Sequence, residues 1–430
     1  MSRITAPHLR TVGVVGIAAL TLTACGGDAD GETNGNGEED VSLSFTWWGG
    51  DTRHEYTQEI IEMFEAEYPH ISVEPLYGEW DGYWDQLATQ TAAQDTPDIV
   101  QMDLMYLREY IENGILLELD AIDTGEFTEE LLDTGRLDGA LYAMPVGQTA
   151  LTFAANLDLF EEAGLERPDD ESWTWDDLLE AATEVSENTD AYGQAGSFGD
   201  AGFEIWLRQT YGVSNLDEDG QLAWEPEDAV PYFELLEQFQ EAGAIPSAAE
   251  ISEERGITRE QTLIATGGAA LSEAWDTTLV ALSSNEGVDL HPLMLPSETG
   301  NAADAGMYYK ASMFYSVYAG TEHPEEAQLF VDFLVNNEEA GQLQSLERGI
   351  PGNESVRELI RDDLDDVQTR ILEFSESLEE VVGDSPPLPP EGFGAVQEII
   401  WRYEEEFLFG RLSAEEAAEG MHGEIDSSVN

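Results

Sequence analysis

Residues 41–50 read VSLSFTWWGG, and this stretch decides how the globular part of the chain begins. Apolar and hydroxyl side chains alternate from Val41 to Trp47, which is the period of a strand that buries one face. Trp48 breaks the alternation, and Gly49 and Gly50 end the strand. We therefore expect Trp48 to point away from the core face, at the end of a sheet where ligands bind. Glycines at that place let backbone N–H groups approach a ligand closely.

The residues that follow alternate between helical and extended patterns. Apolar side chains recur at helical spacing from Tyr56 to Tyr68, and residues 71–76 and 97–102 have the pattern of strands. Helical patterns over residues 83–93 and 104–112 follow these two strands. This alternation of strands and helices predicts an α/β fold with a parallel sheet.

The pattern changes beyond residue 139. Residues 140–146 and 151–155 have strand-like composition, and later extended patterns occur at 269–272 and 307–318. Most other segments are helical in pattern, namely 157–163, 175–184, 203–211, 230–242, 325–336 and 338–346. At 430 residues, the chain is long enough to form two lobes with separate cores.

The charge of the chain is extreme. It contains 91 Asp and Glu against 16 Lys and Arg, giving a formal net charge of −75, and Lys310 is its only lysine. The sequence has no basic stripe that could neutralise phosphates, so nucleic acid is not an expected partner. Because the acids are spread along the whole chain, we interpret them as an adaptation to a saline medium, which screens their repulsion. Against this background, a pair of carboxylates does not by itself indicate acid–base catalysis.

The N-terminal segment has the composition of a secretory signal. Two arginines precede an apolar stretch, residues 12–20, and the sequence Leu-Thr-Ala-Cys ends at Cys25. This segment resembles a bacterial lipoprotein signal, which is cut before its cysteine. We therefore expect residues 1–24 to be removed, Cys25 to carry the lipid, and residues 25–40 to form a flexible acidic tether. Since Cys25 is the only cysteine, no intramolecular disulfide can form.

Several stretches, taken in order, resemble the extracellular solute-binding proteins of bacterial ABC importers, in the sugar-binding group that includes maltose-binding protein. The order and spacing of these stretches carry the resemblance: 22–25, 45–50, 101–103, 106–110, 141–145, 273–276, 310–314, 324–327 and 347–351. It implies a two-lobe periplasmic-binding-protein-like fold of type II, in which a hinge joins the lobes and the ligand lies in the cleft. Lobe 1 would comprise residues 41–146 and 312–346, and lobe 2 residues 147–311 and 347–430.

The resemblance also implies a function. The protein is expected to capture a sugar or oligosaccharide and to deliver it to the permease of an ABC transporter, without a cofactor and without catalysis. It would act as a monomer, held by its lipid at the extracellular face of the cytoplasmic membrane.

Sugar sites combine aromatic rings, on which the apolar face of a pyranose stacks, with a few convergent polar groups. On this ground, and from the expected strand ends, we predict ligand contacts for Trp48, Gly49, Asp51, Trp80, Tyr83, Asp103, Trp206, Trp275, Asp276 and Lys310. Three alternatives are open. Asp103 also suits a helix N-cap, and Arg53 is expected to pair with a neighbouring acid. Trp173 and Trp175 are expected to pack.

Two other functions stay open from the sequence. A tethered glycoside hydrolase acting on polysaccharide could use any of the many carboxylate pairs, although the sequence has neither a Gly-x-Ser-x-Gly elbow nor a His-Glu-x-x-His helix. A binding protein for peptides or polyamines would need an acidic, aromatic-lined cleft, which this composition could supply. Glycoside turnover separates the first alternative from binding, and a screen over sugars, peptides and polyamines separates the second.

Overall fold

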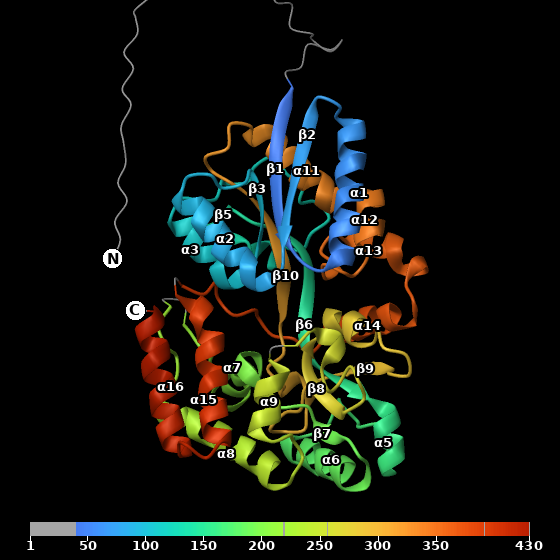
Figure 1. Ribbon diagram of the computed structural model, residues 1–430, viewed down its shortest axis with the longest axis vertical. Helices are drawn as coiled ribbons and strands as arrows, with labels where there is room; N and C mark the ends of the chain where they lie inside the picture. The colour runs from blue at the N-terminus through green and yellow to red at the C-terminus, as the bar shows by residue number, and fades with distance from the viewer. Residues whose placement is uncertain (1–39, 218–219, 256, 391, 430) are drawn as a thin grey trace, which may run out of the picture. The chain divides into compact units, whose positions relative to one another are not determined.

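The computed structural model describes residues 40–217, 220–255, 257–390 and 392–429 (Figure 1). The predicted signal peptide, the lipidation site Cys25 and all of the acidic tether except Asp40 lie outside these residues. Val41–Asn430 forms a unit of its own. Within the described ranges, no helix is both long and apolar enough to cross a membrane.

A mixed sheet runs through the molecule in the order β2-β1-β3-β10-β6-β8-β7, and β9 and β11 also pair with β6. Its strands are β1 (Val41–Trp48), β2 (Ile71–Gly78), β3 (Ile99–Met102), β6 (Met144–Asn156), β7 (Tyr192–Gln194), β8 (Ala269–Trp275), β9 (Leu290–Leu293), β10 (Tyr309–Val317) and β11 (Ile350–Pro351). A separate hairpin pairs β4 (Arg136–Leu137) with β5 (Ala140–Leu141).

The direction of the strands confirms the sequence prediction for the first part of the chain. β1 is parallel to both β2 and β3, as the alternation of strands and helices predicts. In the middle of the sheet, where the sequence pattern changes, β10 runs antiparallel to β3 and to β6. No direction was predicted for this later segment, because no local pattern encodes it.

A first hydrophobic core surrounds β1, β2, β3 and the C-terminal half of β10. Phe45, Trp47 and Phe314 are completely buried in it. The helices that contribute to this core are α1 (Asp51–Glu67), α2 (Trp80–Ala92), α3 (Leu104–Glu112), α4 (Glu129–Asp133), α11 (Pro324–Asn336) and α12 (Glu338–Gln344). In Figure 1 they lie around the upper part of the sheet.

A second core forms around β8 and the C-terminal half of β6. Its helices are α5 (Leu157–Ala163), α6 (Trp175–Asn188), α7 (Gly199–Tyr211), α8 (Pro226–Glu241), α9 (Ala248–Glu254), α15 (Val396–Leu408) and α16 (Ala414–Val429). Trp173 and Trp175 are both buried in this core, which confirms their predicted packing role. A smaller third core joins α10 (Leu279–Leu282), α13 (Glu354–Ile360) and α14 (Asp366–Ser377).

Two antiparallel strands, β6 and β10, connect the first and second cores. Met144 near the start of β6 lies in the first core, and Phe153 near its end lies in the second. β10 makes the reverse crossing, since Tyr309 packs against the second core and Phe314 lies in the first. These strands therefore bring residues of both cores together in the middle of the sheet (Figure 1).

Candidate ligand-binding site

The end of β1 carries a cluster of aromatic rings. Trp48, the last residue of β1, packs against Trp80, Tyr83 and Trp84, with ring centroids 5.0, 5.2 and 5.5 Å away. Trp48 is 8% exposed and Tyr83 3%, whereas Trp80, the first residue of α2, is only half-buried. Trp80 is therefore the ring of this cluster that a ligand can reach most easily.

Tyr83 is held by the core. Its hydroxyl donates a hydrogen bond of 2.6 Å to the carbonyl of Gln101, and burial raises its pKa well above the ordinary value. Trp80 and Tyr83 share the face of α2 that meets Trp48, since residues three apart lie on one side of a helix. Trp80 is the first residue of the helix and stays half-buried, whereas Tyr83 is buried. Tyr83 was predicted to contact a ligand, and in the structure its hydroxyl donates to a backbone carbonyl of the protein.

The polar residues predicted on this side have different surroundings. Asp51 is exposed in the first turn of α1. Asp103 is the N-cap of α3, and its Oδ1 accepts a hydrogen bond of 3.0 Å from the backbone N–H of Met105, as the alternative interpretation expected. Gly49 has a φ of +150°, and a Cβ at this position would lie 2.4 Å from Cδ of Arg53. Glycine is therefore needed here to make room for Arg53.

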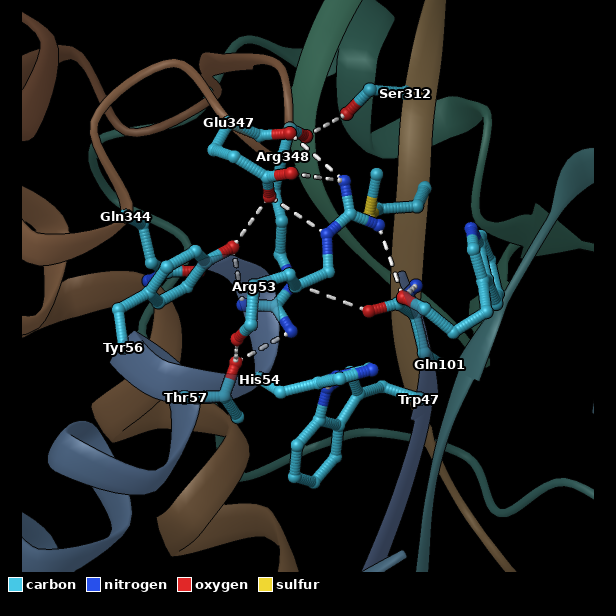
Figure 2. A network of polar contacts seen from close by, with 12 residues as sticks. Trp47, Arg53, His54, Tyr56, Thr57, Gln101, Ser312, Gln344, Glu347 and Arg348 are labelled. Atoms are coloured by element: carbon cyan, nitrogen blue, oxygen red, sulfur yellow. Dashed lines mark hydrogen bonds and ion pairs between the residues drawn. The ribbon is translucent and has the colours of Figure 1, made fainter. Parts of the chain in front are cut away.

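Arg53 forms the ion pair that the sequence interpretation favoured. Its Nε lies 2.7 Å from Oε2 of Glu347, and its Nη2 donates to the Glu347 carbonyl at 2.9 Å (Figure 2). Nη1 donates to the carbonyl of Trp48 at 3.2 Å. The Arg53 guanidinium thus ties the end of β1 to the segment after α12.

Arg348 extends this network into the interior. It is 1% exposed and donates to the hydroxyls of Tyr56 and Thr57, each at 2.9 Å, and to Oε1 of Gln101 at 3.2 Å. In Figure 2, Arg53 extends from α1 toward Glu347, and the guanidinium of Arg348 reaches Tyr56 and Thr57 of the same helix. Glu347 and Arg348 were assigned to lobe 2 by the resemblance, but their side chains contact residues that pack in the first core.

Trp275 and Asp276 lie at the end of β8, in the region of the second core. Trp275 is the last residue of the strand, and Asp276 follows it. Trp275 is half-buried, whereas Asp276 is completely buried. Asp276 Oδ1 accepts hydrogen bonds from the Thr149 hydroxyl at 2.6 Å and from the Thr277 N–H at 2.7 Å. Burial raises the pKa of Asp276 to about 7. Trp275 is accessible to a ligand, and Asp276 instead fastens β8 to β6.

Lys310 meets Trp275 across the crossing strands. In the sheet register Lys310 of β10 faces Thr149 of β6, two residues before the Leu151 that pairs with Trp275. The Lys310 Nζ lies 4.1 Å from the centroid of the Trp275 ring, a cation–π contact. Two of the predicted site residues are thus in direct contact.

Trp206 lies deeper, on α7. It is 7% exposed and packs near Trp175 and Tyr232, with ring centroids 6.4 and 6.2 Å away. Its Nε1 is buried and has no acceptor. A buried donor of this kind normally has a hydrogen-bond partner, so a water or ligand oxygen would accept a hydrogen bond from this N–H.

Three carboxyl groups at the start of α7 were not identified from the sequence. Glu404 of α15 is completely buried and accepts hydrogen bonds from the hydroxyl of Tyr232 and the N–H of Gly199. Burial raises the pKa of Glu404 to about 7, and raises that of Glu273 well above its ordinary value. Asp200 adds its charge to this group. These residues are far apart in sequence, so no spacing signal links them.

Two hollows of the surface lie away from the predicted residues. One of about 490 Å³ lies along α15 and α16, where Arg402 and Glu424 line it. A small one of about 20 Å³ lies beside Arg348. In the part of the chain that the structure describes, no group of three His, Cys, Asp or Glu side chains is arranged to hold a metal ion.

Sequence comparison decides the family. Residues 50–341 match the family model of the bacterial extracellular solute-binding proteins. The chain belongs to this family. Its members bind solutes, sugars among them, and work with the permeases of ABC importers. We call the regions around the first and second cores lobe 1 and lobe 2 from here on.

Curated relatives match parts of the chain. A putative binding protein of Brucella abortus is 30% identical over 176 residues, which cover 38% of this chain and 41% of that protein. An uncharacterised lipoprotein of Streptomyces antibioticus is 23% identical over 299 residues, covering 65% of this chain and 63% of that protein. The chain thus spans about two fifths of the length of the first curated relatives that it matches.

Solved structures match over nearly the whole chain. A periplasmic solute-binding protein of Pectobacterium atrosepticum has a TM-score of 0.80 at 22% identity, over 91% of this chain and 100% of that one. An oligogalacturonide-binding protein of Yersinia enterocolitica, in complex with saturated digalacturonic acid, has a TM-score of 0.79 at 24% identity, over 90% and 98%. A substrate-binding protein of Listeria monocytogenes, in complex with cycloalternan, has 0.75 at 20%, over 90% and 99%. At these identities the likeness shows the two-lobe fold of the periplasmic binding proteins.

Proposed function

We propose that this protein captures a sugar or oligosaccharide between its lobes and delivers it to the permease of an ABC transporter, without making or breaking a bond. One observation carries the proposal: accessible tryptophans stand at strand ends of both lobes, Trp80 beside Trp48 at the end of β1 and Trp275 at the end of β8. Such rings suit the apolar faces of pyranoses, whose hydroxyls bind nearby polar groups.

The solved relatives support a saccharide ligand. The Yersinia protein binds an oligogalacturonide, and the Listeria protein was solved with cycloalternan. A third relative, the GacH receptor of Streptomyces glaucescens, was solved with acarbose, at 18% identity and a TM-score of 0.73 over 91% of this chain and 99% of that one. The shared fold makes a saccharide the first ligand class to test here.

The two crossing strands supply a hinge for the proposed function. A ligand that touches both lobes binds the closed arrangement more tightly than the open one, and so shifts the equilibrium toward closure. Closure of domains around a ligand by changes at a few hinge residues is a common form of such a transition. The permease would then read closure as the loaded state.

We take Trp48, Trp80, Asp51, Trp275 and Lys310 as the proposed ligand-binding set. Gly49, Tyr83, Asp103 and Asp276 each have a structural role described above, and Trp206 would contribute only its indole N–H.

A binding screen with a turnover assay tests the proposal. The processed protein is screened by thermal shift against neutral and acidic oligosaccharides, amino acids, peptides and polyamines, and positive compounds are measured by calorimetry. We expect one class of saccharide to raise the melting temperature and to be recovered unchanged after long incubation. Hydrolysis of the saccharide, or a response confined to peptides or polyamines, would contradict the proposal.

We also propose that Cys25 carries a lipid that anchors the protein at the extracellular face of the membrane. The Leu-Thr-Ala-Cys sequence and the Streptomyces relative named as a lipoprotein support this. Cys25→Ala should release the protein from the membrane fraction, or leave it unprocessed, with saccharide binding intact, because several acyl chains make a stable anchor. Wild-type protein that is free of lipid and still begins at Met1 would contradict the anchor.

A further inference from the structure

Most of the described cations of this acidic chain are paired with a carboxylate. Of its 16 Lys and Arg, 2 lie before residue 40, outside the described residues. Ten of the described ones lie within 4.0 Å of a carboxylate oxygen: Arg53, Arg108, Arg136, Arg167, Arg208, Arg255, Arg361, Arg370, Arg402 and Arg411. In a chain with so many acids, a cation without such a pair needs an explanation.

Four described cations have no such ion pair, and two of them use their N–H groups elsewhere. Arg348 donates to Tyr56, Thr57 and Gln101, as described above, and Arg357 donates to the carbonyl of Pro351 at 3.1 Å. Among the residues that the structure describes, this leaves Arg259 and Lys310, whose cationic groups have neither an ion pair nor a hydrogen-bond acceptor. Both therefore keep their donors available.

The Lys310 ammonium contacts an aromatic ring and is not paired with a carboxylate. The Trp275 ring holds the Nζ from one side at 4.1 Å. Asp200 lies within electrostatic reach of Lys310. Burial raises the pKa of Asp200, and the charge of Lys310 lowers it by a smaller amount. The two side chains form no ion pair within 4.0 Å. A lysine ammonium offers three N–H donors and no acceptor, so this group is suited to bind an anion beside the indole.

Arg259 is the second described cation whose donors stay available. It begins a 3₁₀ turn, Arg259–Gln261, that packs against α10, and its side chain is exposed to solvent. Nevertheless the surrounding protein lowers its pKa, and the nearby charge of Arg53 lowers it further. The charge of Glu347 acts in the opposite direction, so Arg259 lies within electrostatic reach of both members of the Arg53–Glu347 pair at the end of β1.

We infer that the saccharide bound by this protein carries an anionic group, a carboxylate, sulfate or phosphate, and that Lys310 and Arg259 neutralise it. This inference rests on the proposed saccharide-binding function. A net charge of −75 repels an anionic ligand, so such a ligand needs cations at the site itself. A neutral sugar meets no such repulsion, so unpaired cations at the site favour an anionic ligand over a neutral one.

The test compares charged and neutral forms of one saccharide. The probes are digalacturonate, chosen because the Yersinia relative binds digalacturonic acid, its neutral dimethyl ester, and galactobiose carrying a 6-sulfate or a 6-phosphate. Affinities are measured by calorimetry for the wild type, Lys310→Met and Arg259→Gln. The matched control is Arg411→Gln, which removes the same charge from an exposed surface pair with Glu406.

We expect at least one anionic probe to bind more tightly than its neutral counterpart, and the best of the three identifies the anion. Lys310→Met and Arg259→Gln should each weaken that probe by about tenfold or more, as expected for a lost charge-assisted hydrogen bond. The neutral ester should lose much less affinity in these two variants than the anionic probe does, and Arg411→Gln should change the affinity for either by less than about twofold. Melting curves check that each variant is folded, and Lys310→Arg should restore most of the affinity.

The outcomes separate this inference from the proposed function. Two outcomes overturn the inference and leave the proposed function standing. One is binding of neutral saccharides alone, and the other is binding of an anionic probe with the same affinity in wild type and both variants. If no saccharide of the screen binds, both are overturned. Spermidine binding that tightens in Lys310→Met overturns the inference in favour of a cationic ligand that competes for the Trp275 ring.

Discussion

At the scale of single residues, two buried carboxyl groups make folding depend on pH. Asp276 and Glu404 are completely buried, and burial raises the pKa of each to about 7. Unfolded carboxyl groups titrate near pH 4. The folded chain therefore holds protons that the unfolded chain releases between about pH 4 and 7, so the free energy of unfolding falls as the pH rises through this window.

We predict that Asp276→Asn removes part of this pH dependence. Asparagine keeps an oxygen that can accept from Thr149 but does not titrate. The wild type should melt at a higher temperature at pH 5 than at pH 8, and the variant should show a smaller difference. The shift of Asp276 corresponds to about 4 kcal/mol at most. Melting is measured by calorimetry in 1 M salt. Glu419→Gln, which changes an exposed acid, is the control, and equal slopes in wild type and Asp276→Asn would contradict the assignment.

We predict that Trp275→Ala weakens saccharide binding without unfolding the protein. The ring is half-buried and supports Lys310, so its loss should raise the dissociation constant by an amount equivalent to roughly 2–4 kcal/mol, the scale for truncating a large apolar side chain. The control is Trp173→Ala, whose ring is 5% exposed and donates to the carbonyl of Met294. That variant should lower the melting temperature instead. Unfolding of Trp275→Ala with unchanged affinity in any refolded fraction would contradict the site.

Residue types could be predicted from the sequence, but their exposure could not. Trp275 and Asp276 are neighbours, yet one is accessible and the other is completely buried. The difference arises because β8 ends between them and Asp276 meets Thr149, a residue of a distant strand. The N-cap role of Asp103 was predictable because a cap depends on the next few residues only.

At the scale of elements, local patterns predict the bounds of a helix well where the residues that fix its ends are close to it in the sequence. The bounds of α3 and α5 coincide with the predicted residues 104–112 and 157–163. α7 begins at Gly199, four residues before the predicted 203, because Glu404 from a distant helix accepts the first N–H. The direction of β10 likewise depends on pairing across the fold, so local patterns made no prediction for it.

We predict that Gly147→Ala destabilises the crossing strands. A Cβ at Gly147 would lie 2.6 Å from the carbonyl oxygen of Ile350, so the backbone of β11 has to move. Overpacking of this kind costs about 1–3 kcal/mol, which should appear as a lower melting temperature. Gly82→Ala is the control, because a Cβ there meets nothing within 4 Å and alanine favours the helix α2. Equal melting temperatures for wild type and Gly147→Ala would show that β11 yields without cost.

At the scale of the whole molecule, the acids dominate. With 91 Asp and Glu against 16 Lys and Arg, most carboxylates have no cation to pair with. We predict that the melting temperature rises substantially between about 10 mM and 1 M salt, because the Debye length shrinks from about 30 Å to about 3 Å. The measurement is a calorimetric series in NaCl at fixed pH. A flat series would mean that local structure already compensates the acids.

The two-lobe fold was predictable because it depends on the order of many weak stretches along the chain, which sequence preserves. The contact of Lys310 with Trp275 was not, since it requires the register of three strands, β10, β6 and β8. Arg259 gave no local signal at all, because its importance lies in what surrounds it in space.

The contact between Lys310 and Trp275 also makes the protein easy to label. Since Lys310 is the only lysine, an amine-reactive dye has a single side chain to modify, besides the α-amino group of the chain. A dansyl group attached there would stand next to an indole that can excite it by energy transfer. Because a ligand bound at Lys310 would shield the amine, the rate at which this fluorescence develops would follow occupancy of the site, with no cysteine introduced and no engineered tag.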